Sequence, residues 1–485
     1  MMSSRFAPLV VIVAALLAAS TAVARDALPR AVGRAFLDHG VPLNRVAIVV
    51  QEVGAPKPIF AYDADRPMNP ASVMKLVTTF AALELLGRDY RWKTEAYLGG
   101  PILNRTLKGD LILKGYGDPK VTIEQWQSFM TMLRANGLDA IDGDLALDRS
   151  YFSLPPHDPA AFDAEPLKPY NVGPDALLVN FKSLRLMFAP NAAAGTVLVD
   201  SEPRLAEVAV GTPPALATSD CGDWRSNVGA RILNAGDKAM IAFSGRYAED
   251  CGERDWWIAL LDHPHYVHAL FTAAFRDAGG RFAGGLTERR VPRNAHPFAT
   301  LESPPLYDIV RDVNKLSNNV MARQIFLTLG ARAFPPPATP AKGADAVKAW
   351  LRSRKLSIPG LVLENGSGLS RHERITAGGL ARLLLAADAS SVRDEFASSL
   401  AVAATDGTVQ QRFQNGTVAG QALLKTGSLE GVRALAGYVI DGEGRRFVVV
   451  AIINHRNAGA GAPALDYLVQ WVYQNGATWT PALQH

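Results

Sequence analysis

The sequence predicts an α/β protein, because strand patterns and helix patterns occur together at both ends of the chain. Near the N-terminus, the β-branched apolar run 45–51 (RVAIVVQ) predicts a buried strand, and residues 71–86 predict an apolar helix. Near the C-terminus, two apolar strands at 433–440 and 445–454 flank the turn sequence DGEG, which indicates a hairpin.

Further elements complete the two terminal regions. A turn from Gly54 to Pro58 followed by a short strand at 59–62 predicts an N-terminal hairpin. Toward the C-terminus the helical patterns cover three segments, at 306–329, 376–387 and about 464–473.

The middle of the chain has a different sequence pattern. Short strand-like runs, such as Asp110 to Lys114, Ala176 to Phe181 and Trp256 to Leu261, are separated by Pro- and Gly-rich segments. A length of 485 residues suggests two or three domains. We therefore expect an inserted region of mostly β character at 96–296, nested in a unit built from residues 25–95 and 297–485.

The first 24 residues resemble a secretory signal. Arg5 precedes an apolar run from Ala7 to Leu17, and Ala22-Val23-Ala24 supplies small residues for cleavage. No later stretch reaches the roughly 18 apolar residues that a membrane helix needs. We expect a mature chain that starts near Arg25, works in the periplasm and associates with membranes at most peripherally. An uncleaved N-terminal anchor is the alternative.

The charge balance bears on binding partners, and the cysteine content bears on disulfide bonding. The 50 basic and 46 acidic residues give a net charge of +4, and the basic residues are scattered, so we expect no nucleic-acid partner. Cys221 and Cys251 are the two cysteines of the chain. In an exported protein they form a candidate disulfide pair, with two separate buried thiols as the alternative.

Ser72 and Lys75 carry the first chemical signal. A serine hydroxyl is a poor nucleophile at neutral pH and needs a nearby base. Residues three apart on a helix share a face, so Lys75 can supply that base. This S-x-x-K spacing occurs in penicillin-recognising serine enzymes.

Two further triplets follow in the order that this chemistry requires. They are Ser317-Asn318-Asn319 and Lys425-Thr426-Gly427, the latter followed by Ser428 and the predicted C-terminal hairpin. Alone, the first triplet would be explained as a helix cap and the second as a surface turn. All three motifs together, in this order, indicate one active site.

The chain resembles the D-alanyl-D-alanine carboxypeptidase/endopeptidase family, the class C low-molecular-mass penicillin-binding proteins. Lys75 and Ser317 are separated by 242 positions, which resembles this family's large insertion. The resemblance implies a penicillin-binding/β-lactamase-like transpeptidase fold, an antiparallel sheet flanked by helices on both faces. The stretches that carry it are 69–87, 109–119, 169–181, 303–324, 364–376, 406–413 and 423–439.

The resemblance also implies catalytic roles. Ser72 would attack the carbonyl of the penultimate D-Ala of a peptidoglycan stem peptide and form an acyl-enzyme. Lys75, neutral because of burial and of nearby Lys425, would take the proton. Ser317 would relay a proton to the leaving amine, and Asn319 would orient Lys75.

Substrate binding follows from the same resemblance. Lys425 and Thr426 would hold the terminal carboxylate, and Gly427 would let the substrate backbone approach. The backbone N–H groups of Ser72 and Ser428 would form an oxyanion hole. β-Lactams would trap Ser72. The alternatives are a β-lactamase and a catalytically idle wall-binding protein.

Some features depart from the family or invite another chemistry. Asn365 stands where the family usually has Asp, and the sequence MARQ at 321–324 replaces a commonly acidic pattern. We expect no cofactor. His263, His265 and His268 lack the regular spacing of a zinc site, so we expect a solvated helix start after Pro264 instead.

Overall fold

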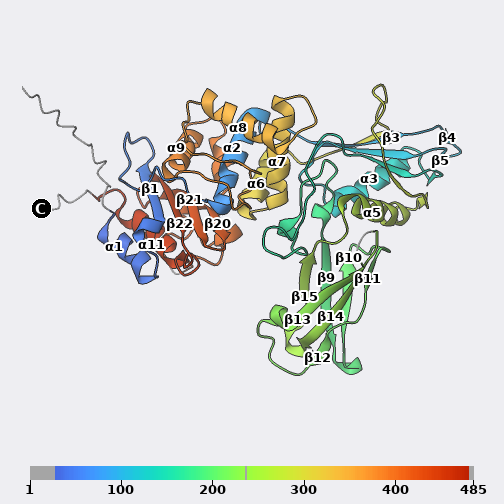
Figure 1. Cartoon of the computed structure of the whole chain (residues 1–485), viewed down its shortest axis with the longest axis horizontal. Helices are drawn as coiled ribbons and strands as arrows, with labels where there is room; N and C mark the ends of the chain where they lie inside the picture. The colour runs from blue at the N-terminus through green and yellow to red at the C-terminus, as the bar shows by residue number, and fades with distance from the viewer. Residues whose placement is uncertain (1–27, 235–236, 415, 480–485) are drawn as a thin grey trace, which may run out of the picture.

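The computed structural model describes residues 28–234, 237–414 and 416–479. The predicted signal segment 1–24 lies outside the described residues. The chain forms one part built from both termini and a second part built from the middle of the sequence (Figure 1). None of the described helices combines the length and the apolar character needed to cross a membrane.

A six-stranded antiparallel sheet forms the centre of the terminal part. Its order is β19-β20-β21-β22-β1-β2, so β1, from the N-terminus, lies between β22 and β2. The pairing runs over the full length of β1, from Val46 opposite Ile453 to Glu52 opposite Phe447. The strands are β1 (Val46–Glu52), β2 (Phe60–Tyr62), β19 (Ala401–Val402), β20 (Ala422–Leu429), β21 (Val432–Ile440) and β22 (Arg446–Asn454).

Helices cover both faces of this sheet, because successive side chains of a strand point to opposite faces. Ala47 and Val49 of β1 enter one apolar core, and Val46, Ile48 and Val50 enter the other. The first core is covered by α2 (Lys75–Leu86), α6 (Leu306–Lys315), α7 (Asn319–Ala333), α8 (Pro340–Ser353), α9 (Ala377–Asp388) and α10 (Arg393–Ser398), and the second by α1 (Arg30–Asp38) and α11 (Ala462–Asn475). The predicted antiparallel sheet between helices is confirmed.

The middle part contains four more sheets, and their strands lie between Lys93 and Glu302, close to the predicted boundaries at 95/96 and 296/297. Two sheets pack with α3 (Ile123–Ala135) and α5 (His263–Asp277). Their strands are β17 (Leu286–Glu288), β8 (Leu145–Asp148), β6 (Leu111–Gly115), β3 (Lys93–Leu98) and β18 (Ala299–Glu302) in one, and β16 (Arg281–Phe282), β7 (Ala140–Ile141), β5 (Thr106–Leu107) and β4 (Ile102–Leu103) in the other.

The remaining two sheets form a lobe that projects from the body (Figure 1). In this lobe Cys221 and Cys251 are joined in a disulfide, with their Cα atoms 4.7 Å apart. The strands are β9 (Leu184–Asn191), β10 (Thr196–Glu202) and β15 (Arg254–Ile258) in one sheet, and β11 (Val208–Val210), β12 (Ala215–Ala217), β13 (Val228–Asn234) and β14 (Ala239–Ala248) in the other; the short helix α4 (Trp224–Asn227) precedes β13.

Two local predictions need correction, and some helices were not predicted. Residues 176–181 form turns and the start of a short 3-10 helix instead of a strand, and Phe181 has φ +51°. The helical segment 306–329 is two helices, because the chain breaks at 316–318. Helix α3 was not predicted, although Thr122 and Gln125 form a capping box at its start.

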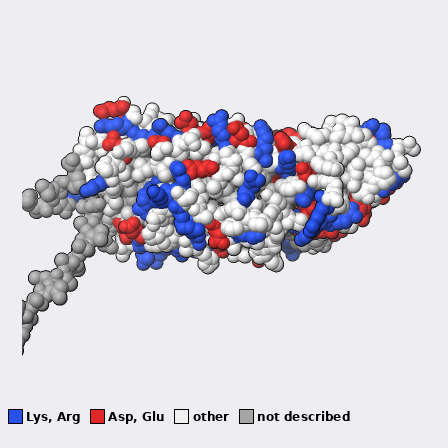
Figure 2. Space-filling view, turned by 90° about the horizontal axis from the view of Figure 1, so that it is seen from above, with Lys and Arg blue, Asp and Glu red and all other residues white. Residues whose placement is uncertain are grey.

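Charges are mixed on the surface. In the view from above, Lys and Arg side chains alternate with Asp and Glu over most of the face (Figure 2). Many of them pair, such as Lys108 with Asp142 at 2.6 Å and Arg105 with Asp139 at 2.6 Å. Such exposed pairs each contribute only about 0–1 kcal/mol to stability.

Candidate active site

A tight turn presents Ser72 at the start of α2. Residues Ala71–Met74 form a 3-10 turn that continues directly into α2 at Lys75. Asn69 holds the entry to this turn, because its Oδ1 accepts the N–H of Ala71 at 2.9 Å and its Nδ2 donates to the carbonyl of Ser370 at 2.8 Å. The half-buried Ser72 side chain therefore stands at a rigid corner.

The amine of Lys75 is the centre of the site. It lies 2.9 Å from Ser72 Oγ, 2.6 Å from Asn319 Oδ1 and 2.5 Å from the carbonyl oxygen of Ser367, and the side chain is fully buried. A neutral amine has two N–H donors and one lone pair. The two carbonyl-type oxygens take the two donors, so the lone pair is left to accept the Ser72 proton.

Burial is the main reason why the amine can be neutral. Burial lowers the pKa of Lys75 well below its ordinary value, and the positive charge of Lys425 lowers it further. Arg323 acts in the same direction, whereas the carboxyl of Glu373 raises the pKa of Lys75. The expected effect of burial and Lys425 is thus seen, and Arg323 and Glu373 are contributors that the sequence reasoning missed.

A second lysine–serine pair faces the first from β20. The Nζ of Lys425 donates to Ser317 Oγ at 2.8 Å and to the carbonyl of Thr426 at 2.8 Å. Burial lowers the pKa of Lys425 to about 7. Ser317 reaches this position because it lies in the break between α6 and α7 with φ +57°.

Strand β20 passes close to the Ser72 turn. A Cβ on Gly427 would lie 2.5 Å from the carbonyl oxygen of Pro70 and 3.2 Å from the nitrogen of Ser72, so only glycine fits there. The side chain of Ser428, the next residue, is exposed. Because β19 pairs only with Leu423 and Leu424, the outer edge of β20 beyond Leu424 has no strand partner among the described residues.

We expect Gly368→Ala to destabilise the fold strongly. Gly368 has φ +81°, and a Cβ there would lie 1.9 Å from the carbonyl oxygen of Ala71. The Ser72 turn would have to move, at a cost of about 3 kcal/mol or more in the free energy of unfolding. Gly420→Ala is the matched control, since Gly420 has φ +74° but open space around it, and it should cost only about 1–2 kcal/mol. Equal urea midpoints for the two variants would contradict this prediction.

The middle part of the chain contributes directly to the site. Asn319, whose Oδ1 contacts Lys75, donates from Nδ2 to the carbonyl of Tyr170 at 3.2 Å. Phe162 packs against an apolar cluster beside the nucleophile, which contains Ala71, Leu369, Leu429 and Val432. A cavity of about 1180 Å³ extends from this place between segments 154–174 and 364–372.

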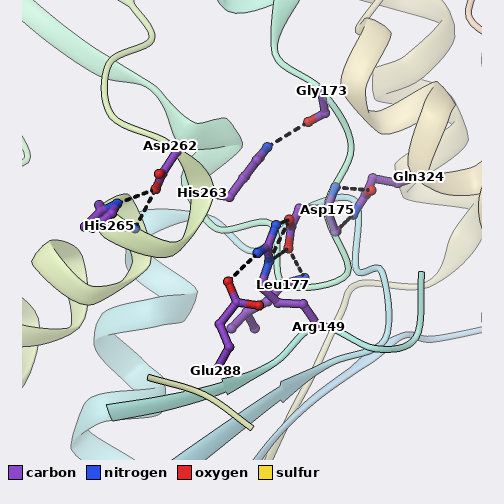
Figure 3. A network of polar contacts seen from close by, with 9 residues as sticks. All are labelled: Arg149, Gly173, Asp175, Leu177, Asp262, His263, His265, Glu288 and Gln324. Atoms are coloured by element: carbon purple, nitrogen blue, oxygen red, sulfur yellow. Dashed lines mark hydrogen bonds and ion pairs between the residues drawn. The ribbon is translucent and has the colours of Figure 1, made fainter. Parts of the chain in front are cut away.

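A polar network fastens helix α7 to the middle part (Figure 3). Gln324 of α7 accepts the N–H of Asp175 at 3.1 Å and donates to its carbonyl at 2.7 Å. The carboxylate of Asp175 in turn binds the guanidinium of Arg149, with Nε and Oδ2 2.9 Å apart. Asn319 and Gln324 lie on one helix, so this network helps to hold Asn319, the partner of Lys75, in place.

The three histidines contact different partners. His263, the first residue of α5, contacts the carbonyl of Gly173 at 3.0 Å, and burial lowers its pKa to about 4 (Figure 3). The helix thus starts at His263 instead of after Pro264, and the side chain of His263 is half-buried. His265 contacts Asp262 at 2.7 Å and His268 contacts the carbonyl of Gly284 at 3.1 Å.

Two known carboxypeptidases are similar in sequence to this protein over most of the chain. The D-alanyl-D-alanine carboxypeptidase DacB of Haemophilus influenzae is 24% identical over 418 residues, which is 86% of each chain. The D-alanyl-D-alanine carboxypeptidase of Actinomadura sp. strain R39 is 28% identical over 440 residues, covering 86% of this chain and 79% of that protein.

A solved structure shares the fold. Penicillin-binding protein 4 of Haemophilus influenzae has a TM-score of 0.75 at 23% identity, covering 90% of this chain and 99% of that chain. The same protein in complex with a β-lactam has a TM-score of 0.72, at 23% identity and with coverage of 91% and 99%.

A family model matches residues 28–474, almost the whole described chain. It agrees with the resemblance that the three motifs predicted, and with the structure that brings them together. The chain therefore belongs to the D-Ala-D-Ala carboxypeptidase 3 (S13) family and is a serine-type D-alanyl-D-alanine carboxypeptidase.

Proposed function

We propose that the enzyme cleaves the bond after a D-Ala carbonyl in peptidoglycan stem peptides through an acyl-enzyme on Ser72. One observation carries this proposal: the buried amine of Lys75 lies 2.9 Å from Ser72 Oγ, with its other two contacts taken by carbonyl-type oxygens. That arrangement suits a general base acting on a nucleophile.

The proposed reaction runs in two stages. Ser72 Oγ attacks the carbonyl carbon while Lys75 takes the hydroxyl proton, and the N–H groups of Ser72 and Ser428 stabilise the oxyanion. The C–N bond then breaks, the proton that Lys75 took passes through Ser317 to the leaving amine, and an ester on Ser72 remains. Water hydrolyses that ester and frees the enzyme.

Lys425 and Thr426 are proposed to bind the terminal carboxylate of the substrate. Lys425 is cationic in its protonated form and lies beside Ser317, so a bound carboxylate would sit next to the proton relay. The unpaired edge of β20 supports a substrate that lies alongside it in extended form. The cavity between segments 154–174 and 364–372 leaves room for the rest of a branched stem peptide.

The leaving amine decides between two activities of this site. Free D-Ala leaves in the carboxypeptidase reaction, whereas the amine of a neighbouring stem leaves when a cross-link is cut. The acyl-enzyme is the same in both cases, so we propose that the enzyme also acts as an endopeptidase. The β-lactam complex of the Haemophilus influenzae relative supports β-lactams as inhibitors of this site.

We place this activity in the periplasm. The disulfide between Cys221 and Cys251 supports an oxidising compartment, where such bonds persist. Peptidoglycan, the proposed substrate, lies outside the cytoplasmic membrane.

Digestion of purified peptidoglycan with the protein, followed by mass spectrometry, tests the proposed function. We expect free D-Ala and, for the endopeptidase reaction, monomers released from cross-linked dimers. Neither product, together with no penicillin adduct, would identify an idle wall-binding protein. Rapid hydrolysis of penicillin instead of a stable adduct would identify a β-lactamase.

The rate constant kcat/KM for D-Ala release should pass through a maximum with pH. On the acidic limb of the profile, activity rises as Lys75 loses its proton. Because the pKa of Lys75 is lowered, this limb lies at a lower pH than the ordinary pKa of lysine would give. Activity falls above about pH 7, where free Lys425 loses the charge that binds the carboxylate. A pH profile of wild type and of Lys425→Arg checks this prediction, since arginine stays charged and should remove the alkaline limb. An unchanged alkaline limb in Lys425→Arg would contradict it.

A further inference from the structure

The carboxyl of Glu373 lies fully buried behind the catalytic pair. Its Oε1 accepts three backbone N–H groups, those of Glu364 at 3.1 Å, Asn365 at 3.0 Å and Gly366 at 2.9 Å. Its Oε2 has no hydrogen-bond partner within the described part of the chain. Burial raises the pKa of the Glu373 carboxyl, and the three converging N–H groups oppose that rise because they favour the negative charge.

The loop held by Glu373 contacts the catalytic helix twice. The carbonyl of Ser367 accepts from Lys75 Nζ at 2.5 Å, and the carbonyl of Gly366 accepts from Thr78 Oγ1 at 2.6 Å. Lys75 and Thr78 are one turn apart on α2. Glu373 is therefore one loop away from the amine that must take the Ser72 proton, without touching the substrate position itself.

Glu373 is also an acidic group that lies near Lys75 together with the cations Lys425 and Arg323. Lys425 and Arg323 both lower the pKa of Lys75, and Glu373 opposes them. Arg323 is nine-tenths buried, and its Nη1 donates to the carbonyl of Val172 at 3.2 Å. No acidic side chain among the described residues pairs with Arg323 within 4.0 Å, so Glu373 and Glu364 act on its charge only through space.

The neighbouring Asn365 is a neutral amide whose Oδ1 accepts from Ser367 N at 2.9 Å and from Ser367 Oγ at 2.7 Å. The Ser367 loop itself thus carries no negative charge at 365. Glu373 supplies one from eight residues further along the chain, to the backbone of the same loop.

We propose that Glu373 is a positioning residue for the catalytic base. It holds the loop 364–368 so that the Ser367 carbonyl orients Lys75. This inference rests on the proposed function. Penicillin acylation of the wild-type protein at Ser72 tests the proposed function separately, so the two can fail independently.

The test is the pH dependence of penicillin acylation in Glu373→Gln. Glutamine keeps the shape but removes the charge, so positive Lys425 and Arg323 act on Lys75 unopposed. We expect the acidic limb of the acylation rate to move down by about half to one pH unit. The rate at the optimum should fall about tenfold or more, because the loop loses charge-assisted hydrogen bonds and holds Lys75 less well.

Two more variants sharpen the test. Asn365→Asp combined with Glu373→Gln returns one negative charge to the loop and should move the limb back. Asn365→Asp alone adds a carboxylate beside Glu364 and Glu373 and should move the acidic limb up, and this variant decides the question if Glu373→Gln does not fold. Glu84→Gln is the matched control: Glu84 lies on α2, accepts from Trp350 Nε1 at 2.8 Å and should affect only stability.

A wild-type pH profile in Glu373→Gln would overturn the proposal, even if the thermal midpoint fell. So would the same limb shift in Glu84→Gln, since that would mean a nonspecific effect of weakening α2. If only Asn365→Asp can be measured, an unmoved acidic limb overturns the proposal as well.

Discussion

Ser72→Ala will form no covalent adduct with penicillin, and its D-Ala release will fall by about 10⁴-fold or more. The reason is that Ser72 Oγ is the hydroxyl aligned with the buried amine of Lys75 at 2.9 Å. The turn that presents it is held by Asn69 and Gly368, so the fold should survive loss of one oxygen. Intact-protein mass spectrometry after incubation with penicillin measures the adduct directly.

The control for this variant is Ser128→Ala. Ser128 lies on α3 in the middle part of the chain, where its hydroxyl donates only to the carbonyl of Glu124. It should acquire the same adduct mass as the wild-type protein. A penicillin adduct that persists in Ser72→Ala would assign the nucleophile to another residue and disprove the proposed mechanism.

Lys75→Met will slow acylation by about 10²–10⁴-fold, the range that a general base typically contributes. Methionine fills a similar volume but has no lone pair for the Ser72 proton. Lys75→Arg should fail to a similar degree, because arginine keeps the positive charge but stays protonated. This pair of variants separates the loss of a base from the loss of a charge. Stopped-flow measurement of penicillin acylation gives the rates.

Lys182→Met is the matched control for a buried lysine. Its Nζ donates to the carbonyl of Leu261 at 2.7 Å in the middle part, and burial lowers its pKa to about 8. We expect a wild-type acylation rate for this variant. Fast acylation in Lys75→Arg would mean that the charge of Lys75, and not its lone pair, serves catalysis.

Local parts of this site could be predicted because they depend on short-range geometry. Ser72 and Lys75 are three residues apart, and one turn of helix brings their side chains together whatever surrounds them. The pairing of β21 with β22 could also be predicted, since a hairpin turn joins two apolar strands. The three motifs together pointed to one site although no pairing between distant strands could be derived.

Other parts of the site depend on tertiary packing and left no signal in the sequence. Ser367 and Tyr170 contribute carbonyl oxygens, and every residue has one, so their residue types reveal nothing. Ser317 lies in a break between two helices, and Asn318 caps the second helix, which is the explanation that the triplet would have on its own. Glu373 could have been noticed only as a charge that burial would make costly, and burial of that loop was not predictable.

The position of β1 also determines when this enzyme can become active. The strand that precedes Ser72 pairs on one side with β22, from Val46 opposite Ile453 onward, so about 400 residues must be made before its long edge finds a partner. Pairings of such long sequence separation form late and slowly. Lys425 arrives on the same late segment. A chain truncated before these last strands therefore holds Ser72 without a finished active site, because the sheet closes only when both ends of the chain are present.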